Sequence, residues 1–215
     1  MTSPAHNSYR EYYREIELHW CWRREHQMIV SPIEFEAMER WHQAEVPLPV
    51  VLRAIDLFIE KKNKSPRRKT SLLLTQVDST VQKVHREYDI LHKGEGENEE
   101  NGDLLGKKLA GIQRRLKKLV PEYPEHLAIL EQSLAALKAV KVVDIVDVDT
   151  VDTELQQIEE MLIEALTASL SADELRYMRE DIEEVLPEAE EPKLFARMLR
   201  DSIRDHFGLP RFNLL

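Results

Sequence analysis

Two runs of Lys and Arg are the parts of this sequence whose residue types are suited to binding a charged ligand. The first run lies within residues 61–69 and interrupts two apolar stretches, so we interpret it as an exposed loop. Cationic side chains contact phosphate groups of nucleic acid without regard to base sequence. The candidate contacts are Arg67, Arg68 and Lys69, with Lys61, Lys62 and Lys64 beside them. The alternative is that the run is only a solvated surface.

The second basic run lies within residues 107–118 and carries the same two interpretations. It contains Lys107, Lys108, Arg114, Arg115, Lys117 and Lys118. Gly102, Gly106 and the lysines that follow resemble a phosphate-binding loop only superficially. The glycine spacing is one residue short, and Lys108 stands where that motif has Ser or Thr. We therefore expect no bound nucleotide, and no other cofactor.

Metal chemistry has two weak candidates in the sequence. Glu39 and His42 have the Glu-x-x-His spacing of carboxylate-bridged metal sites, but such sites need a second copy of the motif, and none is present. Asp144, Asp147 and Asp149 precede Asp152 in an acidic stretch that lacks the glycine and distal glutamate of a calcium loop. We expect no metal site. The eight histidines form no catalytic constellation that spacing alone reveals.

Aromatic residues are concentrated near the amino terminus at helical spacing, where they could stack on bases or form a core. The cluster contains Tyr9, Tyr12, Tyr13, Trp20 and Trp22. Aromatic side chains at this spacing favour the core interpretation. Cys21 lies between the two tryptophans and is expected to be a small packed residue.

Composition is that of a globular protein, with 42% hydrophobic and 33% charged residues among 215. No apolar run approaches the roughly 18 residues of a membrane span. The amino terminus lacks the apolar core of a secretory signal, and the single cysteine rules out a disulfide within the chain. We therefore expect a cytoplasmic protein that does not enter a membrane.

Charge divides the chain into two halves of opposite sign. Residues 1–120 carry 21 Lys and Arg against 18 Asp and Glu, a net charge of +3. Residues 121–215 carry 9 against 22, a net charge of −13. Residues 93–103 contain several Gly and Glu and almost no apolar residue, which indicates a flexible linker. We therefore predict a helical module over residues 1–92, an acidic linker over 93–103 and an acidic helical bundle over 104–215.

Hydrophobic periodicity predicts helices throughout, and the fold class is expected to be all-α. In the first module we expect helices over residues 8–30, from 31 to about 44, from 47 to 60 and over 71–88. Ser31, Pro32 and Glu34 form a strong helix start, with Glu34 closing a capping box. Ile33 is expected on the apolar face of that helix, and Asp56 on the solvated face of the next.

The second module shows a tighter apolar period, with leucines and isoleucines alternating steps of four and three residues. This spacing predicts an antiparallel helical bundle. Ser171 and Glu174 predict another capping box, and Gly208 with Pro210 should stop the last helix after Phe207. Residues 141–152 fit either an extended segment or a helix.

Residues 28–60 resemble the opening of the DnaD-type domain of bacterial replication-initiation and primosome-loading proteins. The resemblance rests on a Ser-Pro-x-Glu helix start, a tryptophan that closes this helix, and an apolar helix after a proline. The matching residues are Val30, Ser31, Pro32, Glu34, Met38, Trp41, Pro47, Val50, Val51, Ala54 and Ile55. The resemblance implies a helical protein that assembles at DNA, here single-stranded DNA, and no enzymatic activity.

Three functions therefore remain open at the level of sequence. The first is a non-enzymatic, DNA-associated adaptor linked to replication, whose acidic bundle contacts a protein partner. The second is a helical scaffold for protein–protein interaction with no nucleic-acid role. The third is a metal-dependent helical enzyme that uses Glu39 and His42 with further ligands.

Overall fold

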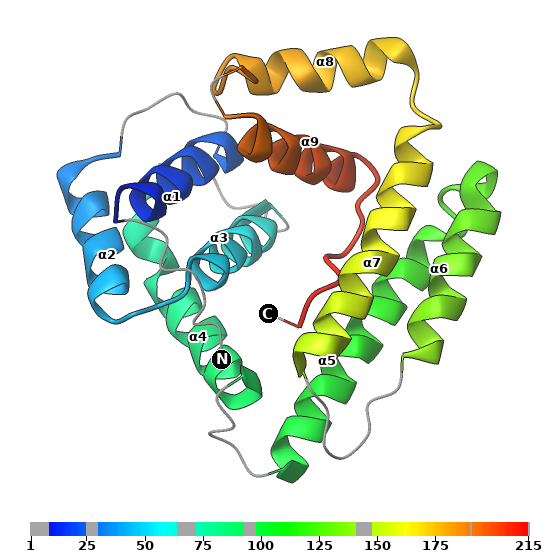
Figure 1. Cartoon of the computed structure of the whole chain (residues 1–215), viewed down its shortest axis with the longest axis horizontal. Coiled ribbons are helices and arrows are strands. Elements are labelled where there is room, and N and C mark those ends of the chain that lie inside the picture. The colour runs from blue at the N-terminus through cyan, green and yellow to red at the C-terminus, as the bar shows by residue number, and fades with distance from the viewer. Residues whose placement is uncertain are drawn as a thin grey trace. The chain divides into compact units, whose positions relative to one another are not determined.

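The computed structural model describes residues 9–24, 30–63, 72–92, 98–140, 148–189 and 191–214. Within these ranges the chain forms nine α-helices, two short 3-10 helices and no strand (Figure 1). The all-α prediction is confirmed. None of the described helices is long and apolar enough to cross a lipid bilayer. The chain divides into two compact units, residues 1–89 and 90–214, each with its own core.

The first unit consists of four helices and a 3-10 turn that precedes the last of them. In chain order these are α1 (Tyr9–Arg23), α2 (Pro32–Gln43), α3 (Leu48–Asn63), η1 (Leu74–Val77) and α4 (Asp78–His92), whose last turn crosses the unit boundary. Helix α1 packs against α3, and α2 contacts α1 and η1. The predicted helix over residues 71–88 is wrong at its start, because η1 comes first and α4 begins only at Asp78.

Aromatic side chains of α1 form much of this core. Tyr12, Tyr13 and Trp20 are buried, so the core interpretation is confirmed for these three, whereas Tyr9 is exposed. The hydroxyl of Tyr12 donates to the carbonyl oxygen of Val46 at 3.1 Å. This bond fixes the turn between α2 and α3 against α1.

The first turn of α2 contains a buried carboxylate, Glu34, that holds three segments together. Its Oε2 accepts the backbone N–H of Ser31 at 3.0 Å and the Ser31 hydroxyl at 2.9 Å. Its Oε1 accepts the indole N–H of Trp20 at 3.1 Å, an Arg24 guanidinium N–H at 3.3 Å and the backbone N–H of Leu74 at 2.9 Å. The predicted helix start is confirmed, and the same residue also joins α1 to η1.

Two side-chain orientations in this unit differ from the predictions. Ile33 was expected in the core but is exposed, because the helix turns the adjacent Glu34 inward to reach its five donors. Asp56 of α3 was expected in solvent but is buried, because α1 covers that face of α3 and supplies Arg23 and His19 as partners. In both cases a carboxylate is buried together with hydrogen-bond donors from another helix.

The second unit is built on helices α5, α6 and α7, which pack in succession and alternate in direction (Figure 1). Its elements are α5 (Asn98–Leu119), η2 (Pro124–His126), α6 (Leu127–Ala139), α7 (Val148–Thr167), α8 (Ala172–Glu183) and α9 (Pro192–His206). Helix α9 packs against α7 and α8. Helix α9 ends before Gly208, which adopts a positive φ of 63°, as the predicted stop requires.

The predicted linker over residues 93–103 is wrong in its second half. Helix α5 begins at Asn98, so residues 98–103 are helical, whereas residues 93–97 lie outside the described residues. Glutamate has a favourable helix propensity, and negative charge suits a helix amino terminus, so a Glu-rich segment can extend the helix that follows it. Helix α7 begins at Val148, whereas residues 141–147 also lie outside the described part of the chain.

The Glu34 site makes the stability of the first unit depend on pH. Burial raises the pKa of this carboxyl, but the hydrogen bonds from Ser31, Leu74 and Trp20 outweigh burial, and the pKa lies below its ordinary value of 4.5. A lowered pKa in the folded state stabilises the protein above the unfolded-state pKa, and this contribution is lost as pH falls through the folded-state pKa.

We predict that Glu34→Gln lowers the free energy of unfolding at pH 7 by about 2–4 kcal/mol, because buried donors lose their charged acceptor. Below pH 4.5 the difference between wild type and variant should shrink. Urea unfolding followed by circular dichroism at several pH values measures both effects. Glu36→Gln, on the exposed side of α2, is the matched control and should change stability by less than about 0.5 kcal/mol. Equal effects of the two substitutions would contradict the role given to Glu34.

Candidate nucleic-acid interface

The first basic run is described only at its beginning. Lys61 and Lys62 form the exposed end of α3, and the Lys62 ammonium lies 5.2 Å from the centre of the Phe58 ring. Lys64, Arg67, Arg68 and Lys69 lie outside the described residues. Lys61 and Lys62 are therefore accessible to a phosphate, whereas the placement of the other four candidates stays a prediction.

The second basic run forms one face of α5. Lys107, Arg114 and Lys118 are exposed and occupy positions i, i+7 and i+11, which align along the helix at separations of about 10 and 6 Å. The opposite side of the helix is buried through Leu109 and Leu116. Core packing of α5 therefore directs these three cationic side chains to solvent. We call Lys107, Arg114 and Lys118 the basic stripe.

The surroundings of the basic stripe reinforce its positive charge. Arg115 and Lys117 are exposed on its two flanks, and the sequence has no acidic residue between Asp103 and Glu122. Gly111 lies beside the stripe, and a Cβ built at this position would meet no atom within 4 Å. The surface is open there, so a polyanion can approach the helix closely.

Lys108 differs from the other cations of this run. Its ammonium donates to the backbone carbonyl oxygen of Leu214 at 2.6 Å, and it is only partly exposed. It therefore serves the internal structure of the second unit.

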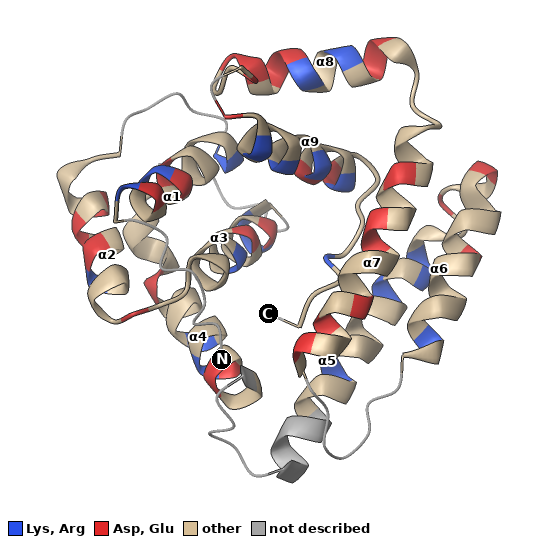
Figure 2. Cartoon of the chain, in the orientation of Figure 1, with Lys and Arg blue, Asp and Glu red and all other residues tan. Residues whose placement is uncertain are grey.

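Negative charge is concentrated on another helix of the same unit, since red segments recur along α7 whereas blue segments mark α5 (Figure 2). The unit is acidic overall but keeps a positive face on α5.

The metal candidates of the sequence do not assemble within the described residues. No group of three or more His, Cys, Asp or Glu side chains able to hold a metal ion occurs in that part of the chain. The His42 ring instead packs against Tyr9 and Tyr12, with ring centres 5.2 and 5.1 Å away. Asp152 accepts hydrogen bonds from Gln156 and from the backbone of Leu214. Asp144 and Asp147 lie outside the described residues.

A buried ion cluster between α1 and α3 was missed by the sequence interpretation. Asp56, which is 1% exposed, contacts Nε2 of His19 at 3.0 Å and Nε of Arg23 at 2.9 Å. His19 and Arg23 are four residues apart and therefore lie on one face of α1. The signal in the sequence that could have revealed the cluster is this i, i+4 spacing, because His19 and Arg23 stand beside the apolar residues Ile16 and Trp20 on the same helix.

The chemistry available to this cluster follows from its burial. A histidine paired with a carboxylate has the components of a general acid–base pair, but a substrate must come within hydrogen-bond distance of it. His19 is 2% exposed and Asp56 1%, so in this conformation both are covered by protein. The geometry supports a structural role, in which paired charges fix how α1 packs on α3.

Comparisons with known proteins identify one similarity. A family model described as an uncharacterised protein matches residues 8–98, a range that spans the helices of the first unit. Neither a curated protein nor a solved structure matches the chain. The basic stripe on α5 begins beyond the matched range.

The ion cluster provides a test of how the first unit is stabilised. Asp56→Asn keeps the shape of the side chain but removes the buried negative charge that Arg23 and His19 contact, so we predict a decrease of about 3–5 kcal/mol in the free energy of unfolding. Asp173→Asn is the control, because Asp173 is 78% exposed and pairs with Arg176 on the surface of α8. That substitution should cost less than about 1 kcal/mol. Chemical denaturation compares the two, and a cost for Asp56→Asn as small as that of the control would show that the cluster does not hold α1 on α3.

Proposed function

We propose that the protein is a non-enzymatic helical adaptor that associates with DNA through its phosphate backbone. The observation that carries this proposal is the basic stripe with its flanking Arg115 and Lys117, an exposed cationic face on a protein of net charge −10. A positive face on an acidic protein attracts a polyanion at that position, whereas the acidic remainder repels it.

The side chains on this face favour sequence-independent contact. Residues 104–122 contain no aromatic residue, so the exposed side of α5 offers no platform on which bases could stack. Lysine and arginine side chains in a line match successive phosphates and read no base edges. The Lys61 and Lys62 end of α3, with Arg67, Arg68 and Lys69 after it, is a second candidate contact on the first unit.

The replication link rests on the resemblance of residues 28–60 to DnaD-type domains. On this basis the protein acts in the bacterial cytoplasm, where it joins single-stranded DNA to a protein of the replication machinery. Exposed apolar side chains support a protein partner: Phe35 and Ile33 on α2, and Met161 and Tyr177 on the acidic helices α7 and α8. Aromatic side chains and Met are enriched in protein–protein interfaces relative to the rest of the surface.

A scaffold without a nucleic-acid role is the second candidate, favoured by the same exposed apolar residues and by the acidic surface of α7. In that case the basic stripe would bind an acidic protein segment. The two candidates differ in whether DNA binds at all, which the following experiment measures.

We predict that Lys107→Ala, Arg114→Ala and Lys118→Ala together weaken binding to single-stranded DNA equally for all sequences. The slope of log affinity against log salt should decrease by about 0.7 for each phosphate that the protein no longer binds, or about 2 for three phosphates. Fluorescence anisotropy with labelled oligonucleotides at several salt concentrations measures both quantities. Replacing Arg67, Arg68 and Lys69 by Ala tests the loop on the first unit in the same way.

The control is a triple variant with the same change in net charge, made at exposed lysines on other helices: Lys83→Ala, Lys138→Ala and Lys193→Ala. It should leave the salt slope within about 0.5 of wild type, because these lysines do not lie on the basic stripe. Wild-type protein that binds neither single-stranded nor duplex DNA at low salt would exclude the DNA proposal and leave the scaffold.

A further inference from the structure

After α9 the chain continues as a non-helical segment, residues 209–214, which we call the C-terminal strap. Gly208, with its φ of 63°, turns the chain out of the helix, and the backbone N–H of Leu209 donates to the carbonyl oxygen of Arg204 at 2.9 Å. The strap makes no helix of its own, yet Phe212 is 0% exposed and Leu214 1%. Its burial depends on the helices that it crosses.

Side chains of α5 and α7 hold the backbone of the strap. Glu159 Oε1 accepts the N–H of Phe212 at 3.1 Å, and Asp152 Oδ1 accepts the N–H of Leu214 at 2.8 Å. The two carboxylates lie seven residues apart on α7, and the strap runs antiparallel to that helix. Lys108 of α5 donates to the Leu214 carbonyl oxygen at 2.6 Å from the other side. Side chains of α5 and α7 thus bind the strap backbone from two sides, and we call the surface that they form the groove.

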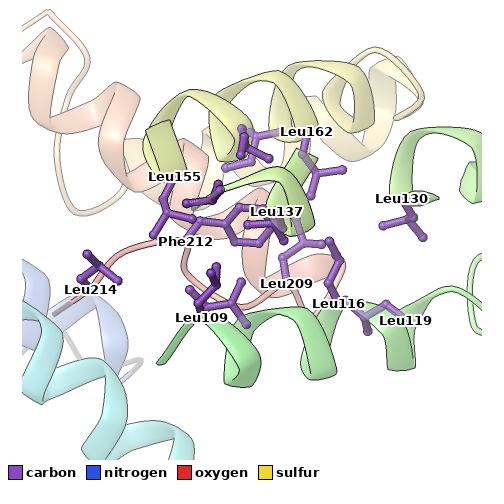
Figure 3. Close-up of a cluster of buried hydrophobic side chains, with 14 of the residues drawn as sticks. Leu109, Leu116, Leu119, Leu130, Leu137, Leu155, Leu162, Leu209, Phe212 and Leu214 are labelled. Atoms are coloured by element: carbon purple, nitrogen blue, oxygen red, sulfur yellow. The ribbon is translucent and has the colours of Figure 1, made fainter. Parts of the chain in front are cut away.

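Two kinds of side-chain contact give this groove selectivity. Leu209 and Phe212 lie among leucines from α5, α6 and α7, and Leu214 is buried at the edge of this cluster (Figure 3). Arg211 pairs with the buried Asp201 of α9 at 3.1 Å. An occupant therefore needs apolar residues at the positions of Leu209, Phe212 and Leu214 and a cation at that of Arg211. Residues 209–214 of this chain are a sequence with that pattern.

We propose that this groove also binds the strap of a second copy of the chain, so that two copies associate by exchanging their straps. Each copy provides one groove and one strap, and reciprocal exchange closes a two-fold dimer that reproduces the contacts of Arg211, Phe212 and Leu214. The local hydrogen bond from Leu209 to Arg204 is lost when the hinge opens. Exchange of an identical element is a low-cost route to a dimer. Gly208 is the hinge, because a glycine can change its backbone angles without a steric penalty.

Competition between the two arrangements determines when exchange occurs. A strap attached to its own groove has an effective concentration in the millimolar range, so the single chain predominates in dilute solution. If one chain has a defective strap and the other a defective groove, neither can close on itself. Only the intact strap of one and the intact groove of the other can then pair.

The experiment uses two full-length variants that fulfil this condition. Phe212→Ala removes the apolar anchor of the strap and leaves the groove unchanged. The double variant Lys108→Glu with Asp152→Lys reverses both polar contacts to Leu214 and keeps the net charge. Each variant alone should have the mass of one chain, 25.2 kDa, by light scattering after size exclusion. A 1:1 mixture at ~100 µM should give a species of twice that mass.

A mixture that stays at the mass of one chain, with both variants folded by circular dichroism, would overturn the proposal. If Phe212→Ala does not fold, Arg211→Glu replaces it, because a carboxylate facing Asp201 weakens the strap and keeps its apolar anchors.

A peptide of residues 207–215 gives an independent measurement. It should bind the Phe212→Ala chain at least about tenfold more tightly than wild type, whose groove is filled by its own strap. Equal binding to both chains, or none to either, would also overturn the proposal.

Discussion

The first unit depends on burying the Glu34 carboxylate with enough donors to keep it charged. A buried charge is costly unless it is paired and hydrogen-bonded, and Glu34 meets this requirement with donors from α1, from its own helix start and from η1. These donors come from segments up to 40 residues away. The carboxylate can therefore be buried only if α1, α2 and η1 assemble together, which links the formation of one helix to the others.

In the second unit, too, carboxylates removed from solvent are paired with side chains that donate hydrogen bonds. Arg204 of α9 contacts Asp201 on its own helix, and it also contacts Glu159 of α7 at 3.0 Å. Arg211 of the strap contacts the same Asp201. Two carboxylates and two guanidinium groups thus balance one another where the strap meets α7 and α9. Because Glu159 also accepts the backbone N–H of Phe212, one side chain joins α7, α9 and the strap. A change at this residue would affect all three.

The distribution of charge connects the fold to the proposed function. Most described carboxylates of the second unit lie on helices other than α5, so the basic stripe has no acidic residue beside it in the sequence. Lys108 of α5 holds the strap through the carbonyl oxygen of Leu214. The basic stripe and the groove therefore share one helix but use different faces of it.

Periodicity and turn chemistry by themselves determined the all-α class, most of the helix positions and their ends at Ser31, Ser171 and Gly208, because these depend on residues close together in the chain. The residue types alone revealed both basic runs. Only the tertiary structure decided which charges are buried. Asp and Glu are residue types usually found at the surface, so no sequence pattern indicated that Asp56 and Glu34 are buried. The partners of Asp56, His19 and Arg23, lie on α1. Two partners of Glu34, Trp20 and Leu74, lie on α1 and η1. The same holds for the strap, whose non-helical backbone carries no periodic signal and is ordered by Asp152 and Glu159 more than fifty residues earlier. Burial of a charge is a property of the assembled helices, which local sequence patterns do not contain.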